Sequence, residues 1–202
     1  MRGTLRTLPI ALVLLSCGAV RSLAAQWQVG IEVAATSYGG SAHDTSSSHV
    51  ASDGRPGNAT AISVRIGRNW RRYGVALRAS YAKPGLAVAG ENVNLTDKTT
   101  GDLFEVVPLV STRVGGIGPS GAVRLELGPA LHLWNLDGDM HARFGALGAA
   151  VYEWPVAGRF SGNAQLEGVL SRSWFDPGDT PPEFERRVTW RYGVGLGLRY
   201  RL

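Results

Sequence analysis

Apolar and polar residues alternate one by one along most of this chain. In the stretch RVTWRYGVGLGLRYRL, residues 187–202, one set of alternate residues is Val, Trp, Tyr and Leu, whereas the other is mainly Gly and Arg. Strict alternation with period two is typical of a β-strand with one apolar and one polar face. The pattern predicts eight strands, at residues 27–35, 62–70, 73–81, 103–114, 122–135, 142–154, 159–175 and 187–202.

The predicted connections alternate between short and long. Short turns are expected at 71–72, in GGIGPSG and near PVAG, and longer loops at 39–58, at 83–102, around NLDGDMHA and in DPGDTPPEFER. An even number of strands, with short turns at one end and longer loops at the other, predicts an all-β fold. We expect an antiparallel up-and-down barrel of the transmembrane kind.

The alternation alone leaves open which face meets the core, because a soluble barrel puts its apolar face inside. The aromatic residues decide this. Thirteen of the 17 lie in two bands near the ends of the apolar face, whose middle is aliphatic, and such girdles are typical of a lipid-facing surface. The predicted membrane-interface aromatics are Trp27, Trp70, Tyr73, Tyr152, Trp154, Phe160 and Tyr200 in one band, and Tyr81, Phe104, Phe144, Trp174, Trp190 and Tyr192 in the other.

The polar face is then predicted to point inward. The interior of eight strands is just wide enough for side chains to fill, and buried charges must pair there because a lone buried charge is costly. With eight Arg and five Glu on this face, any channel would favour anions. The predicted interior charge network is Glu32, Arg65, Arg78, Glu105, Arg113, Arg124, Glu126, His132, Arg143, Glu167, Arg191 and Arg199, with Glu153 and Arg201 on the same face.

Two prolines fall inside predicted strands, where each removes one ladder hydrogen bond. A turn centred near Gly118 and Pro119 makes the numbers of paired residues in the fourth and fifth strands sum to 237. In that register Pro108 lies opposite Pro129, and both face lipid. We therefore expect one local defect, as a bulge or a wider strand spacing.

The N-terminal residues 1–25 read as a signal peptide, followed by a barrel domain at 26–202. Arg2 and Arg6 precede an apolar run, and SLAAQ offers a small-residue cleavage site. Cleavage would remove three arginines and leave 18 basic against 16 acidic residues. The chain also has no basic run that would favour nucleic acid. Cys17, in LLSC, is either removed with this segment or lipidated.

Candidate catalytic and metal sites are weak in this sequence. The glycines of GVGLGL recur every second residue, unlike those of a nucleotide loop. Asp137–Asp139, Asp176–Asp179 and the pair His43 and His49 lack a full metal-ligand set. An enzyme would need a nucleophile, a base and an acid at one height, for which His132 with Glu105 or Glu126, and Ser111, are candidates. We predict no cofactor, no metal and no catalytic site.

The mature chain resembles the small outer-membrane β-barrel proteins of Gram-negative bacteria, of the OmpA-transmembrane and opacity-protein type. The ending YGVGLGLRYRL is similar to the C-terminal strand signal of that family, although Leu202 stands where Phe is usual. The resemblance implies insertion in the outer membrane, contact with its lipid and lipopolysaccharide, and recognition by the assembly machinery, as a monomer. It leaves three hypotheses: a structural or adhesion-like surface element, a narrow channel for small solutes, and a lipid-modifying enzyme.

Overall fold

The computed structural model describes residues 26–40, 42–44, 52–90, 94–97, 101–118, 120–136, 138–173 and 184–202. Regular structure in these ranges consists of β-strands, arranged in two sheets. No helix in the described ranges has the length and apolar character needed to cross a membrane. The predicted signal peptide and Trp174 lie outside the described residues.

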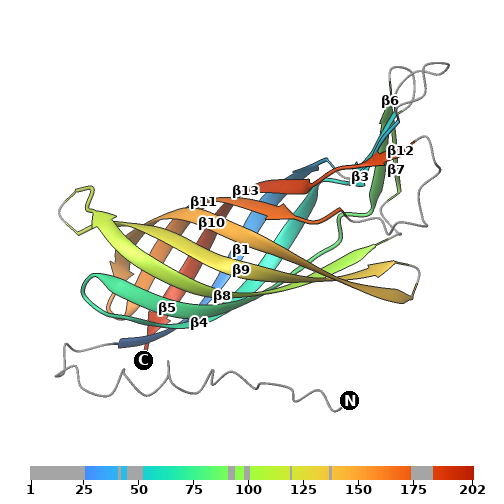
Figure 1. Ribbon diagram of the computed structural model, residues 1–202. Coiled ribbons are helices and arrows are strands. Elements are labelled where there is room, and N and C mark those ends of the chain that lie inside the picture. Colours follow the sequence, from blue (N-terminus) through green and yellow to red (C-terminus); the bar gives the residue numbers. More distant parts are fainter. Residues whose placement is uncertain are drawn as a thin grey trace, which may run out of the picture.

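Eight strands close into an antiparallel barrel, which confirms the predicted fold (Figure 1). Each strand pairs with its neighbours along the chain, and the last pairs with the first from Gln28–Arg201 to Gly39–Trp190. The strands are β1 (Gln26–Gly39), β4 (Ala59–Asn69), β5 (Tyr73–Ala82), β8 (Asp102–Gly115), β9 (Ala122–Leu136), β10 (Asp139–Ala157), β11 (Phe160–Ser171) and β13 (Thr189–Arg201).

Short connections join the barrel strands at one end, which we call the turn end. They are the segments 70–72, 116–121 and 158–159, and Gln26 and Leu202 lie at this end too. At the opposite end, β9 and β10 are joined by only two residues, with Gly138 at φ 99°. The long loop predicted around NLDGDMHA is therefore wrong, because the two strands extend the hairpin instead.

A second, five-stranded sheet lies beyond that opposite end, which we call the sheet end (Figure 1). Its order is β12-β2-β3-β6-β7. The sequence predicts loops at 39–58 and 83–102, but these segments contain four of these strands. The strands are β2 (Ala42–Asp44), β3 (Ser52–Pro56), β6 (Leu86–Gly90), β7 (Asn94–Asp97) and β12 (Phe184–Arg186).

The side chains of the barrel strands alternate between an exposed and a buried face. In β13 the exposed set is aliphatic and aromatic, with Leu196 64% exposed, whereas Arg191, Gly193 and Gly195 between them are buried. A band of exposed Val, Ile and Leu side chains surrounds the barrel. An exposed apolar surface of this extent is favourable in contact with hydrocarbon and unfavourable in contact with water.

The two prolines lie as the register predicted. Every β8–β9 pair from Asp102–Asn135 to Arg113–Arg124 sums to 237, and pairing is interrupted only between Val106–Leu131 and Val110–Leu127. Pro108 and Pro129 fall opposite each other in that interval, and both are exposed on the outer face. The register does not shift there, so the defect is a gap in the ladder without a bulge.

Gly128 lies in the same gap, and we predict that Gly128→Ala destabilises the barrel by about 1–3 kcal/mol through overpacking. A Cβ atom at this position would lie 2.0 Å from the carbonyl oxygen of Pro108. Denaturant unfolding of the refolded protein measures the change. Gly168→Ala is the control, because a Cβ there meets nothing within 4 Å, and its change should stay within about 0.5 kcal/mol. Equal effects would contradict the close approach.

Candidate functional site: a filled barrel between two ends

A network of ion pairs fills the barrel interior. Five arginines and five glutamates take part, and together they come from all eight barrel strands, so the network is balanced in formal charge. In the middle, Arg65 of β4 binds Glu126 of β9 in a bidentate pair, with both N–O distances 2.7 Å. Charge-assisted forked pairs of this kind are among the stronger protein hydrogen bonds.

The group nearest the sheet end joins four strands. Arg78 Nη1 donates to Glu167 at 2.6 Å and its Nη2 donates to Glu105 at 3.1 Å. Arg191 Nη2 lies 3.1 Å from Glu167 and 3.0 Å from Glu105. Glu105 is fully buried, and His132 Nε2 lies 2.9 Å from its Oε2. This arrangement holds two arginines between two carboxylates.

The group nearest the turn end runs from β9 to β1. Arg124 Nε donates to Glu153 at 3.0 Å, Glu153 also pairs with Arg199, and Arg199 Nη2 donates to Glu32 at 2.9 Å. Asn163 Nδ2 donates to the same Glu32 oxygen at 3.4 Å. These contacts join opposite walls of the barrel.

Three arginines of the predicted polar face lie outside this network. Arg113 is exposed near the turn end and donates to the Gly115 carbonyl at 3.5 Å. Arg143 is half-buried near the sheet end and donates to the carbonyls of Ser173 and Ala142, and Arg201 is half-buried at the end of β13. Five of the eight arginines predicted for the inward face thus belong to the network, whereas these three share the inward face but not its central height.

Part of the interior is apolar, which the predicted charge network does not include. Seven buried aliphatic residues line the wall formed by β8, β9, β10 and β11, among them Val107, Leu147 and Val151. Nearer the sheet end, Tyr38, Leu103 and Trp134 form a buried cluster, with the Tyr38 and Trp134 rings 6.3 Å apart and edge-on. This cluster caps the ion-pair network.

The predicted interface aromatics lie mostly on the outer face. Trp27, Tyr73, Phe144 and Tyr192 are well exposed, and Tyr81, Phe104, Phe160 and Trp190 are exposed to a smaller extent. Trp70, Tyr152, Trp154 and Tyr200 are half-buried. Trp70 and Trp154 also line a cavity at the turn end.

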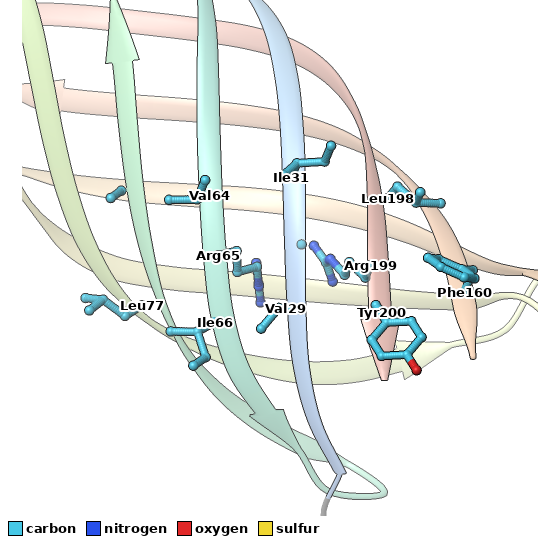
Figure 2. Close-up of a pocket in the computed structure, with 12 residues that line it drawn as sticks. Val29, Ile31, Val64, Arg65, Ile66, Leu77, Phe160, Leu198, Arg199 and Tyr200 are labelled. Carbon is cyan, nitrogen blue, oxygen red and sulfur yellow. The ribbon is translucent and has the colours of Figure 1, made fainter. Parts of the chain in front are cut away.

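The outer face carries an apolar groove of about 540 Å³ over β1, β4 and β13 (Figure 2). Ile31, Val64 and Leu198 are among the side chains that line it. Arg65 and Arg199 come from the strands on either side of β1, as Figure 2 shows, and their side chains belong to the interior network. The groove is suited to hydrocarbon.

The candidate catalytic residues do not come together as a set, because His132 contacts Glu105 but Ser111 lies far from both. His132 lies opposite Glu105, whereas Ser111 lies opposite Glu126, about 20 Å further along β8 at the usual rise per residue. The cavity beside His132, also lined by Ser171 and Thr189, has about 10 Å³, which is room for about one water molecule. In the part of the chain that the structure describes, no three His, Cys, Asp or Glu residues are grouped to hold a metal.

The cavity at the turn end, which we call the turn-end cavity, has about 570 Å³ and is lined by both polar and aromatic side chains. Arg124 and Glu153 of the network form part of its lining, with Arg71, Arg113 and Arg201. The network and the Tyr38, Leu103 and Trp134 cluster lie between this cavity and the sheet end. The filled interior thus separates the two ends of the barrel.

The closed eight-stranded barrel, apolar outside and charged within, defines the fold class of the small outer-membrane β-barrel proteins, and the predicted resemblance is confirmed at the level of the fold. The chain is similar to Neisserial surface protein A (NspA), with 12% identity over 87% of this chain and 97% of that one and a TM-score of 0.57. Ail, the attachment invasion locus protein of Yersinia pestis, matches with 10% identity, the same coverage of both chains and a TM-score of 0.41. No protein-family model and no curated protein sequence matches the chain.

Proposed function

We propose that the chain is an outer-membrane protein that acts at the cell surface, as a structural or adhesion-like element. The observation that carries this proposal is the five-stranded sheet beyond the sheet end of a barrel whose interior is filled. A barrel that only anchors needs no strands beyond the membrane, and a filled interior leaves the outer sheet as the part available to partners. Both edge strands of this sheet, β7 and β12, have only four and three residues, which limits edge-to-edge aggregation.

The turn end then faces the periplasm and the sheet end faces outward, as expected for barrels with short periplasmic turns. In this proposal residues 1–25 are removed as a signal peptide, the C-terminal strand β13 is read by the assembly machinery, and the barrel is a monomer. The exposed aliphatic band and the groove of Figure 2 support contact with lipid and lipopolysaccharide acyl chains. The name of NspA as a surface protein agrees with this position.

Shortening one excursion of the outer sheet tests the surface role. Ala82 pairs with Leu103, and Lys83 Nζ lies 3.7 Å from Asp102 Oδ1 at the base of the excursion. Replacing residues 84–101 by Asn-Gly, a two-residue hairpin turn, should preserve the barrel but reduce attachment of displaying bacteria to coated surfaces and to one another. Gel mobility with and without heating verifies folding. Full attachment by the shortened variant would contradict a role for β6 and β7.

The channel hypothesis predicts a measurable conductance in planar bilayers. We expect instead that conductance is absent or very small. The buried pairs Arg65–Glu126 and Arg78–Glu167 cross the interior, and an eight-stranded barrel has little lumen beyond its side chains. Purified protein incorporated in a planar bilayer, with a large porin as positive control, provides the measurement. Stable openings of porin size would favour the channel.

A further inference from the structure

Positive charge is concentrated at the turn end of the barrel. Six arginines outside the ion-pair network lie there, in the turns or in the last residues of strands: Arg68, Arg71, Arg72, Arg113, Arg159 and Arg201. The described carboxylates lie instead in the interior network or near the sheet end, as Asp102 and Asp139 do. Among the described side chains, this end therefore has a local excess of positive charge.

The turn-end cavity collects part of this excess in a concave site. Arg71, Arg113, Arg124 and Arg201 line it, and among the described residues Glu153 is the one carboxylate in its lining. Glu153 already binds two arginines, Arg124 and Arg199. The site thus has four guanidinium groups and one carboxylate whose charge is shared.

Arg124 is a second, independent indication of a ligand. Its side chain is more than nine-tenths buried, and it lines the cavity. Its Nε donates to Glu153, but its Nη1 has no hydrogen-bond partner in the protein. A buried charged donor without a partner is costly, and an anion bound beside it would offset that cost.

The neutral groups of the cavity fit the same ligand. Gln26, Gln28, Asn69, Ser120 and Ser161 supply amide and hydroxyl groups, and Asn69 Nδ2 donates to Gln28 Oε1 at 3.1 Å. Trp70 and Trp154 supply apolar walls. A volume of about 570 Å³ lies within the usual range of small-molecule sites, and forked guanidinium groups suit phosphate oxygens.

We infer that the turn-end cavity is a binding site for a small phosphate-bearing anion. The ligand is either a soluble phosphorylated molecule or the phosphate headgroup of a lipid in the adjoining leaflet, since both present the same chemistry to the arginines. The proposed function places this site on the periplasmic side, and only that position rests on it. Binding is measured on purified protein, so a failure to bind would leave the proposed surface role unchanged.

Inorganic pyrophosphate is a suitable probe, used with the full chain in a maltoside detergent that has no phosphate group. We expect saturable binding of one pyrophosphate per chain by equilibrium dialysis, with a change in tryptophan fluorescence because Trp70 and Trp154 line the site. Arg71→Gln and Arg113→Gln should each weaken binding about tenfold or more, as expected for a lost charge-assisted hydrogen bond. Both side chains are exposed, so folding should persist and is verified by gel mobility.

Arg72→Gln is the matched control. It removes the same charge from the same turn, but Arg72 does not line the cavity, so binding should stay within about twofold of the parent. Absence of saturable binding, or equal weakening by Arg71→Gln and Arg72→Gln, would overturn the proposed site. Equal weakening would mean that the arginines attract anions only through their summed positive charge.

The two sources of the phosphate are distinguished by lipid added to the micelles. If a headgroup occupies the cavity, phosphatidylglycerol should weaken pyrophosphate binding about tenfold by competition, and Arg71→Gln should abolish that competition. If the ligand is a soluble molecule, phosphatidylglycerol should leave the affinity unchanged. Either result supports a phosphate site and identifies its source.

Discussion

Leu196→Arg should destabilise the barrel by about 2–4 kcal/mol, the cost of placing arginine at the bilayer midplane on the lipid face of a barrel. Leu196 lies near the middle of β13, pairs with Val33 on one side and Ala164 on the other, and is 64% exposed. In water an exposed leucine is replaced at little cost. The expected loss therefore depends on hydrocarbon around this residue. Denaturant unfolding from phospholipid vesicles, followed by tryptophan fluorescence, measures it.

Val114→Arg is the depth control for this experiment. Val114 is exposed on the same outer face, but it is the residue before the last in β8, at the turn end. Arginine near an interface costs about 0–1 kcal/mol because its long side chain reaches the headgroups. A Leu196→Arg variant as stable as the Val114→Arg variant would mean that the apolar outer face does not lie in a membrane.

The alternation of residues was enough to predict the barrel, because each barrel strand has one apolar and one polar face. The same parity could have identified the buried aromatic cluster. Trp134 has the parity of His132 and Glu126 in β9, and Tyr38 has the parity of Glu32 in β1. Both therefore point inward, whereas the prediction assigns aromatic residues only to the two outer bands.

Parity does not determine which inward residues meet. Arg113, Arg65 and Arg143 are all on the inward face, but they lie at different heights. Arg65 lies at the height of Glu126 on the opposite wall, whereas Arg113 and Arg143 lie nearer the two ends and donate to backbone carbonyls. Height depends on strand tilt and stagger around the whole barrel, and a single strand does not reveal either. The predicted set of inward residues thus contains the whole network, together with arginines that lie beyond it toward the turn end and the sheet end.

The second sheet could not be predicted for a related reason. Its strands have three to five residues and no sustained alternation, as in LAVAG of β6. They are held by pairing with segments distant in sequence, such as β2 with β12, and by tertiary contacts such as Arg55 Nη1 to the Tyr38 carbonyl at 2.6 Å. Strand propensity is weak beside such context.

The interior network leads to a second large expected effect. Glu126→Leu should destabilise the barrel by about 3–5 kcal/mol, because it leaves a buried arginine without its partner. Arg65 makes both of its ion-pair contacts with Glu126, and its neighbour across β4 and β5 is another arginine, Arg78. Removing the carboxylate would therefore add repulsion to the loss of the pair. Denaturant unfolding in micelles measures the change.

The double variant Arg65→Met/Glu126→Leu distinguishes an ion pair buried away from water from one that is hydrated. Replacing both partners by apolar groups of similar size removes the desolvation cost together with the attraction, so the double variant should be more stable than Glu126→Leu alone. The aliphatic wall nearby, with Val107 and Leu147, offers such side chains an apolar environment. If Glu126→Leu left the unfolding midpoint unchanged, water would have to reach Arg65, and the interior would be open enough for the channel hypothesis to return.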